Sequence, residues 1–293
     1  MARSHPPTLL TLAERTLREE CRLARNEHVL VAVSGGGDST ALLHVLARLA
    51  PKLGFRVSAH GVDHGLRPEA AAELALAERL AGVLSVPFAR TVLRVAPGGN
   101  LQNRAREARR TALLAAADGV GATRIATAHH ADDRAETVLI RILHGATPSA
   151  LAVLPASEGR FLRPLIRATK ADVLLHLERH ELVFASDPSN EERRFLRVRV
   201  RKELLPLLTE LSPAIVDHLT ALADELAALP ASATFPVPLK RAHRRAVDRA
   251  VASGRTARVR LPRDLELVVD PKAGPTKLVQ TDGPARRPRR SGR

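Results

Sequence analysis

A short apolar run that ends in a glycine turn and leads directly into a helix is the most constraining feature of this sequence. Residues 28–33 read His-Val-Leu-Val-Ala-Val, a pattern typical of a buried strand, and residues 34–39 read Ser-Gly-Gly-Gly-Asp-Ser. A helix pattern follows from Thr40 to Ala50 and is expected to close at Pro51. Glycines allow positive φ and close approach to a ligand, while turn N–H groups and a helix N-terminus attract anions. The pattern therefore predicts a strand, an anion-binding turn and a helix.

The alternation of strand and helix continues along the first half of the chain. Further strands are expected at residues 55–59, 86–95 and 124–127, and further helices at residues 8–25, 68–82 and 103–118. Such alternation implies βαβ units, a parallel sheet and helices on both of its faces. We therefore expect an α/β fold with a doubly wound parallel sheet. Motifs that follow the first, second and fourth strands should meet at the carboxyl edge of that sheet, where ligands bind.

Past residue 150 the alternation fades. Helices are expected up to His180, over residues 191–208 with a stop at or shortly after Pro206, and from Ser212 to about residue 229, before two short strands at 257–261 and 265–269. We predict an α/β domain at residues 1–208, a helical linker at 209–236 and a basic C-terminal segment at 237–293. The end of that segment, from Gly283, is rich in Pro and Arg and is expected to be disordered.

The charge is uneven along the chain. Lys and Arg number 46 against 31 Asp and Glu, and residues 237–293 hold 16 basic and five acidic residues, +11 of the net +15. Most basic residues are Arg, which also fits a coding bias, but a bias does not explain this distribution. A polyanionic partner such as nucleic acid is the alternative. Because Trp and Tyr are absent, Arg and backbone contacts would have to replace aromatic stacking.

Cysteine content and hydropathy exclude several classes of protein. The single cysteine, Cys21, rules out a disulfide framework and a Cys-rich zinc site. No apolar run approaches the roughly 18 residues of a membrane span, so we expect a cytoplasmic protein without a membrane partner.

The glycine turn carries an unexpected carboxylate. Asp38 would repel phosphate, so its presence fits a role in holding Mg²⁺ or in orienting an attacking group. The turn is neither a Walker A loop nor the GxGxxG fingerprint of dinucleotide-binding proteins. The alternative is a purely structural turn, although such turns rarely need three glycines between serines.

Two further groups of polar residues follow predicted strands. Residues 60–67 include His64 and could contact a nucleotide or a metal, although loop residues of this kind are more often simply exposed. Residues 127–137 contain Asp132, Asp133 and Glu136 at the start of a helix, where spacings of three and four place carboxylates on one face. These carboxylates are candidates for Mg²⁺ or for an amino group; the alternative is that they only complement the helix dipole.

These motifs resemble a known enzyme family. Ser34–Ser39 resembles the SGGxDS pyrophosphate loop of the PP-loop ATP pyrophosphatases, which cleave ATP between its α- and β-phosphates. Residues 60–67 and 127–137 resemble signature segments of the tRNA(Ile)-lysidine synthetases. Residues 103–110, 187–190 and 194–206 also match that family, and the segments keep its order.

The resemblance implies an activity and its cofactors. Members of that family join lysine to C2 of the wobble cytidine in an isoleucine tRNA with a CAU anticodon, through an adenylated intermediate, and release AMP and pyrophosphate. ATP and Mg²⁺ are the implied cofactors, and that tRNA and free L-lysine are the implied partners. A homodimer is left open, and the residues that hold the metal remain unassigned.

The resemblance also implies roles for individual residues. The ATP-binding residues are expected to be Ser34, Gly35, Gly36, Gly37, Asp38 and Ser39. The catalytic residues are expected to be Asp38, His64 and Arg109. Asp132, Asp133 and Glu136 are expected to hold lysine or a metal, with Asp133 and Glu136 favoured for lysine. The residues expected to bind tRNA are Arg194, Arg197, Arg199 and Arg201.

Three other functions remain as alternatives. A related tRNA thiolase would commonly need pairs of cysteines, and only Cys21 is present. A non-catalytic module with the same fold would bind ATP or RNA without making pyrophosphate. A glutamine-dependent ligase would need an amidotransferase domain, for which the sequence shows no evidence.

Overall fold

The computed structural model describes residues 7–63, 69–93, 101–185, 196–228, 241–254, 256–261, 265–270 and 274–280. The chain forms two compact units: residues 1–137 with 153–221, and residues 138–152 with 222–293. The division predicted from the sequence, into residues 1–208, 209–236 and 237–293, stays a prediction. No helix in the described ranges is both long and apolar enough to cross a membrane.

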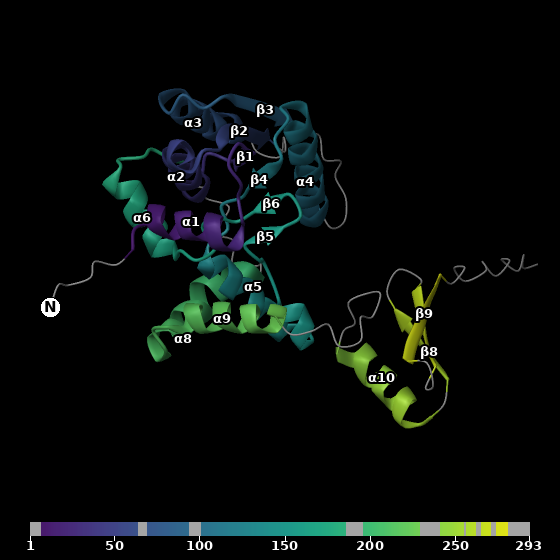
Figure 1. Ribbon diagram of the computed structural model, residues 1–293. Helices are drawn as coiled ribbons and strands as arrows, with labels where there is room; N and C mark the ends of the chain where they lie inside the picture. Colours follow the sequence, from purple (N-terminus) through teal and green to yellow (C-terminus); the bar gives the residue numbers. More distant parts are fainter. Residues whose placement is uncertain are drawn as a thin grey trace, which may run out of the picture. The chain divides into compact units, whose positions relative to one another are not determined.

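A six-stranded sheet forms the centre of the first unit, in the order β3-β2-β1-β4-β6-β5 (Figure 1). All neighbours are parallel except β5 and β6, which are antiparallel. The strands are β1 His28–Val33, β2 Arg56–Asp63, β3 Phe88–Val92, β4 Arg124–Ala126, β5 Ser157–Glu158 and β6 Phe161–Leu162. The parallel α/β fold is confirmed, and the strand at 28–33 has the predicted bounds. The short β5–β6 hairpin was not predicted because two-residue strands carry no periodic signal.

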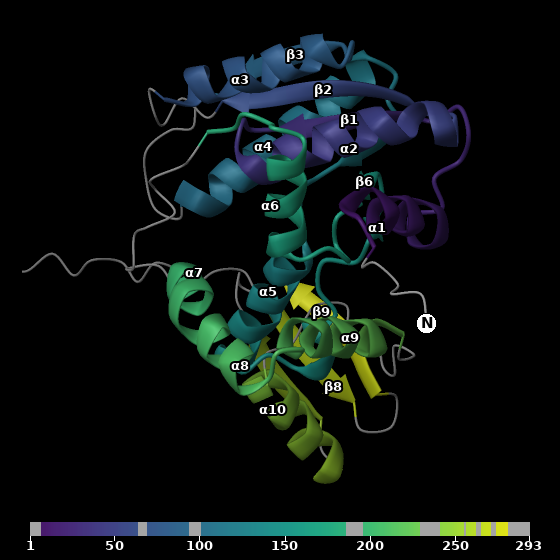
Figure 2. The same cartoon turned by 90° about the vertical axis from the view of Figure 1, so that its left-hand side faces the viewer.

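The alternation of side chains along β1 explains why both faces of the sheet are covered. Val29, Val31 and Val33 belong to one apolar cluster, which also contains buried residues of α1, α2 and α6. Leu30 and Ala32 belong to a second cluster on the opposite face, under α4. Because successive strand residues point to opposite faces, this continuous apolar run is what a doubly covered sheet requires. Figure 2 looks onto the first face, with α2 and α6 in front of the sheet.

Helices precede the first strand, connect successive strands and follow the last strand of this sheet. They are α1 Leu9–Arg15, α2 Gly37–Leu53, α3 Ala70–Val83, α4 Leu101–Gly119, α5 Ala131–Leu143, α6 Lys170–Arg179, α7 Leu196–Arg199, α8 Leu205–Leu211 and α9 Ile215–Ala228. Short π-helical turns extend α1 (Thr16–Glu20) and join α7 to α8 (Val200–Leu204), and a 3₁₀ turn spans Pro148–Leu151.

Two prolines do not end helices where the sequence predicts. Pro51 lies inside α2, which continues to Leu53 and ends at Gly54, a left-handed residue with φ 74°. Pro206 lies in the first turn of α8, where the missing N–H costs little, and the helix continues to Leu211. The glycine with positive φ, rather than the proline, terminates α2.

The second unit contains a helix and a small antiparallel sheet. The helix α10 is Arg241–Ala252, and the sheet is formed by β7 Ala257–Leu261, β8 Leu265–Asp270 and β9 Gly274–Gln280 in the order β7-β8-β9. Val247 of α10 and Val259, Leu267 and Val269 of the sheet are buried. The two strands predicted here are confirmed, β9 is additional, and the end predicted to be disordered lies outside the described residues.

Candidate functional site

The glycine turn between β1 and α2 has a conformation that requires glycine. Gly35 has φ 83°, and a Cβ atom on it would lie 2.1 Å from the carbonyl oxygen of Glu73. Gly36 is the N-cap of α2, and Ala185 from the segment after α6 donates its N–H to the carbonyl of Gly35 at 2.9 Å. The turn is therefore held between α3 and a distant segment, with the first turn of α2 beyond it.

The hydroxyl groups of Ser34 and Ser39 form hydrogen bonds within the glycine turn. The Ser39 Oγ accepts a hydrogen bond from the Ser34 N–H at 3.1 Å and lies 3.2 Å from the Ser34 Oγ. It also donates to the carbonyl of Gly36 at 3.0 Å. These bonds fix the two serines on the same side of a helix N-terminus, the arrangement that favours binding of an anion such as phosphate.

Asp38 lies next to two cationic side chains from other elements. Its Oδ1 is 2.5 Å from the Nζ of Lys170, the first residue of α6. Its Oδ2 is 3.8 Å from the Nε2 of His130, which precedes α5. The parallel pairing of β1 with β4 brings this histidine to Asp38, since the segments after both strands leave the same edge of the sheet. The predicted convergence of the motifs after the first and fourth strands is thus confirmed.

The carboxylates at the start of α5 have different partners. Asp132 accepts the backbone N–H of Lys170 at 2.7 Å. Glu136 is buried and accepts hydrogen bonds from the Nε atoms of Arg197, at 2.9 Å, and Arg201, at 2.5 Å. Asp133 accepts hydrogen bonds from Nη2 of the same two arginines at 3.0 and 3.3 Å. In this structure Arg197 and Arg201 therefore neutralise Asp133 and Glu136.

His130 is the centre of the acidic group. Burial disfavours its charged form, but the neighbouring carboxylates of Asp132, Asp133 and Asp38 outweigh burial and raise the pKa of His130. Burial would likewise raise the pKa values of Asp132 and Asp133, yet the neighbouring His130 and, for Asp133, Arg197 lower them. The site thus favours ionised carboxylates around a protonated histidine.

Two cavities share Asp38 in their linings. One, of about 480 Å³, is lined by acidic and basic side chains that include Asp132, Glu136, Lys170 and Arg201. The other, of about 380 Å³, is lined by Ser34, Ser39, three arginines of α4, and His129, among others. Asp38 lines both cavities. The same carboxylate can therefore contact a ligand in either cavity.

The second cavity is rich in arginine. Arg109 lines it, and burial lowers the pKa of this guanidinium. Arg110 lies with its Cζ 4.0 Å from the centre of the Phe161 ring, and both residues line the cavity. Burial lowers the pKa of His129 to about 4, so this imidazole is neutral near pH 7 and can accept or donate a hydrogen bond. The cavity suits a polyanion that carries a planar ring.

The structure brings most of the predicted site residues together. The predicted residues that line the two cavities are Ser34, Asp38, Ser39, Arg109, Asp132, Glu136 and Arg201. The three glycines at 35–37 form the turn beside them, and Asp133 lies in contact with His130. Arg199 instead forms an exposed ion pair with Glu203 at 3.1 Å. The predicted residues His64 and Arg194 lie outside the described residues.

Sequence reasoning missed Lys170. The only local signal is the capping box at the start of α6, in which Thr169 and Asp172 bond to each other's backbone N–H. That signal places Lys170 in the first turn of a helix, but only the tertiary packing of α6 against α2 places its ammonium against Asp38. His130 belongs to the motif at residues 127–137, but its role depends on three carboxylates from the first turns of two helices, an arrangement that the sequence does not reveal.

Comparison with known proteins finds a family match and related sequences over most of the chain. The PP-loop domain family matches residues 9–208. A tRNA(Ile)-lysidine synthase of Symbiobacterium thermophilum is 42% identical over 218 residues, which cover 70% of this chain and 44% of the relative. One from Leifsonia xyli subsp. xyli is 40% identical over 208 residues, 70% of this chain and 62% of the relative. The matched region thus covers about half the length of these relatives.

A solved structure shows the same fold. The U34-tRNA thiolase NcsA from Methanococcus maripaludis, with its [4Fe-4S] cluster, aligns with a TM-score of 0.65 at 17% identity. The alignment covers 77% of this chain and 80% of the thiolase chain. At that identity the likeness concerns the arrangement of helices and strands alone.

Proposed function

Because this chain belongs to the PP-loop domain family, we propose that it is an ATP-dependent ligase that joins lysine to the wobble cytidine of an isoleucine tRNA. The product would be lysidine in a CAU anticodon, as the names of the relatives suggest. The observation that carries the proposal is that Asp38 lines both an arginine-rich cavity and a carboxylate-lined cavity. A ligase of this kind needs one site for ATP and another for an amine on either side of the reacting base. We place the enzyme in the cytoplasm.

We assign the arginine-rich cavity to ATP. The serines and glycines of Ser34–Ser39 would contact the phosphates through hydroxyl and N–H groups, and Arg109 would compensate their charge. Lys170, whose ammonium reaches Asp38 from the other cavity, is placed to attract the departing pyrophosphate.

The donor set also fits Mg²⁺. Asp38 and Asp132 offer carboxylate oxygens in one cavity, and Mg²⁺ is commonly held by one or two carboxylates together with substrate phosphates. When bound, Mg²⁺ would offset phosphate charge during the release of pyrophosphate. Both carboxylates already have cationic or N–H partners, so a bound Mg²⁺ would share Asp38 with Lys170.

We assign the carboxylate-lined cavity to lysine. Asp132 and Glu136 line it directly, while Asp133 supports it through His130 and the two arginines. An arriving ammonium competes with Arg197 and Arg201 for the carboxylate oxygens. We infer that these arginines turn to phosphate groups of the tRNA when lysine binds, which reconciles their present ion pairs with a role in RNA binding.

The chemistry then proceeds in two balanced steps. The cytosine O2 attacks the α-phosphorus of ATP, a P–O bond forms, and pyrophosphate leaves. The lysine ε-amine attacks C2 as the free base, the surplus proton on its nitrogen passes to water, and AMP leaves with the former O2. Positioning and fixed charges supply most of the rate enhancement in such a site.

The structure disfavours sulfur transfer as the alternative. Cys21 is the only cysteine of the sequence, is buried, and lies with its Sγ 3.4 Å from the carbonyl oxygen of Ala156. Burial raises the pKa of its thiol to about 11, so the reactive thiolate is not formed near pH 7. One such cysteine cannot replace the several thiolates that hold an iron–sulfur cluster.

The first prediction tests the ligase assignment against a non-catalytic module. Asp38→Asn should lower incorporation of labelled lysine into a CAU isoleucine transcript by about 10²–10³-fold, because a charged group at the reacting centre is lost. Asp118→Asn, which removes only an exposed ion pair with Arg160, is the matched control and should be nearly as active as wild type. Wild type that binds ATP but makes neither pyrophosphate nor lysidine would instead support the module.

Lys170 yields the second prediction. Lys170→Ala should lower the rate of pyrophosphate release by about 10²-fold, since a cation near the leaving group is removed. Lys170→Arg should recover much of that loss. The control is Lys52→Ala. Lys52 lies on α2, the helix that also carries Asp38, and forms an exposed ion pair with Glu14 of α1. Equal activities of Lys170→Ala and Lys52→Ala would remove Lys170 from the mechanism.

The third prediction concerns the basic segment from residue 237 onward, which we propose binds the tRNA backbone. Arg245 and Arg249 are exposed on α10, and replacing both with Gln should weaken tRNA binding. The slope of log affinity against log salt should fall by about one for each phosphate that the variant no longer neutralises. Arg15→Gln, on α1, removes an equally exposed charge as a control. Unchanged affinity and slope in the α10 variant would exclude this face of α10 from tRNA binding.

A further inference from the structure

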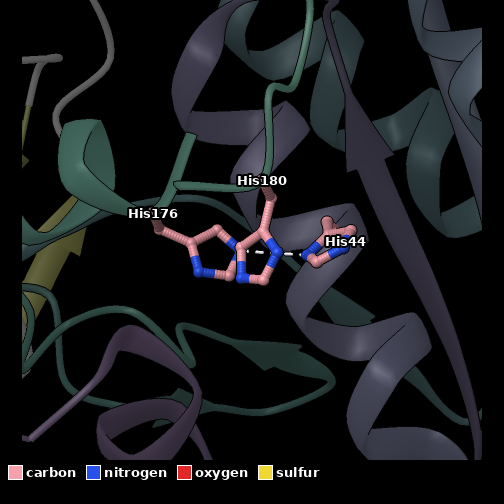
Figure 3. A group of neighbouring side chains, drawn as sticks. All are labelled: His44, His176 and His180. Carbon is pink, nitrogen blue, oxygen red and sulfur yellow. Dashed lines mark hydrogen bonds between the residues drawn. The ribbon is translucent and has the colours of Figure 1, made fainter. Parts of the chain in front are cut away.

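Three histidines lie together away from both cavities of the candidate site. His44 is in the middle of α2, His176 is in the last part of α6, and His180 is the C-cap residue of α6. One ring nitrogen from each lies within 4.8 Å of the others. Figure 3 shows the three rings facing one another, with the hydrogen bond between His44 and His176 drawn as a dashed line.

The positions of the three residues follow from helix geometry. His176 and His180 are four residues apart, which places them on one face of α6. That face packs against α2, where His44 Nδ1 lies 2.9 Å from His176 Nε2. Ring centroids are 4.5–5.0 Å apart in all three pairs.

Burial keeps two of these imidazoles in the form that binds metals. His44 is 6% exposed and His176 is 5% exposed. Burial, followed by the charges of neighbouring histidines and arginines, lowers the pKa values of both to about 4. Neutral imidazole is the ligand form, so no proton has to be displaced by a metal near pH 7. A hydrogen-bonded pair alone would explain His44 and His176, but it does not account for the third ring.

We propose that His44, His176 and His180 bind one divalent transition-metal ion of the Zn²⁺ type. Imidazole nitrogens suit Zn²⁺, Co²⁺, Ni²⁺ and Cu²⁺, and three histidines leave a fourth tetrahedral position. His180 is only half-buried, so water can reach that position from its side. Arg48 and Arg179 add positive charge nearby and repel a cation. The site should therefore bind the metal ion more weakly than the same three histidines would without these arginines.

The ion would join the two helices that carry the ion pair of the candidate site. Asp38 is in the first turn of α2, about two helical turns before His44. Lys170 is the first residue of α6, and His176 and His180 lie at the other end of that helix. A metal between α2 and α6 therefore fixes the packing on which the distance between Asp38 and Lys170 depends. The role is structural, and it does not require the proposed ligase activity.

Metal binding by the full-length, tag-free chain tests this proposal. The protein is freed of metal with a chelator, and Zn²⁺ is added under calorimetry, with Co²⁺ absorption as a second readout. We expect one equivalent to bind, to raise the melting temperature, and to give the intense visible bands of tetrahedral Co²⁺. His180→Ala should weaken this binding by about tenfold or more, because a ligand is removed. His44→Gln serves as a second ligand variant.

His218→Ala removes an exposed histidine of α9 and is the matched control, with unchanged binding expected. Melting curves without metal establish that each variant is folded. A wild-type chain that binds no Zn²⁺ or Co²⁺ would overturn the proposal. Binding that persists undiminished in folded His180→Ala would also overturn it, because the metal would then belong to another group, such as His130 with its carboxylates.

Discussion

The parallel pairing of β1 with β4 is the constraint on which the site depends. Val29, Leu30 and Val31 are in register with residues 124–126, so the segments that follow both strands leave the sheet at the same edge. Buried apolar side chains on both faces of β1 hold this strand in the interior of the sheet. The glycine turn and the start of α5 therefore meet, although about 90 residues separate them in the sequence.

At this edge of the sheet, acidic side chains are paired with basic ones. Four carboxylates, Asp38, Asp132, Asp133 and Glu136, lie among Lys170, Arg197, Arg201 and the proton-binding His130. Buried charges need such partners, because desolvation without compensation costs several kcal/mol for each ion. Each partner in this network can also be exchanged for a substrate group of the same sign.

Sequence reasoning could predict the fold and the loops of the site, but not the partners of the site's charges. The strand at 28–33 and its glycine turn carry strong local signals, and the alternation of elements predicts their common edge. The pairing of Glu136 with Arg197 and Arg201 spans more than 60 residues and depends on how the helix after residue 195 packs. Lys170 and the cluster of His44, His176 and His180 were missed for the same reason, since each joins α6 to α2. Pro51 shows the converse: a strong local stop signal was outweighed by the packing of a long helix.

Exchange of labelled pyrophosphate into ATP most directly tests the proposal that cytidine reacts with ATP before lysine takes part. The account predicts exchange when wild-type protein, ATP and the CAU isoleucine tRNA are present without lysine, because adenylation of cytidine precedes attack by the amine. Glu136→Gln should retain this exchange while losing incorporation of lysine. Exchange that requires lysine, or that proceeds with lysine in the absence of tRNA, would contradict the account, since lysine rather than cytidine would then take part in the first step.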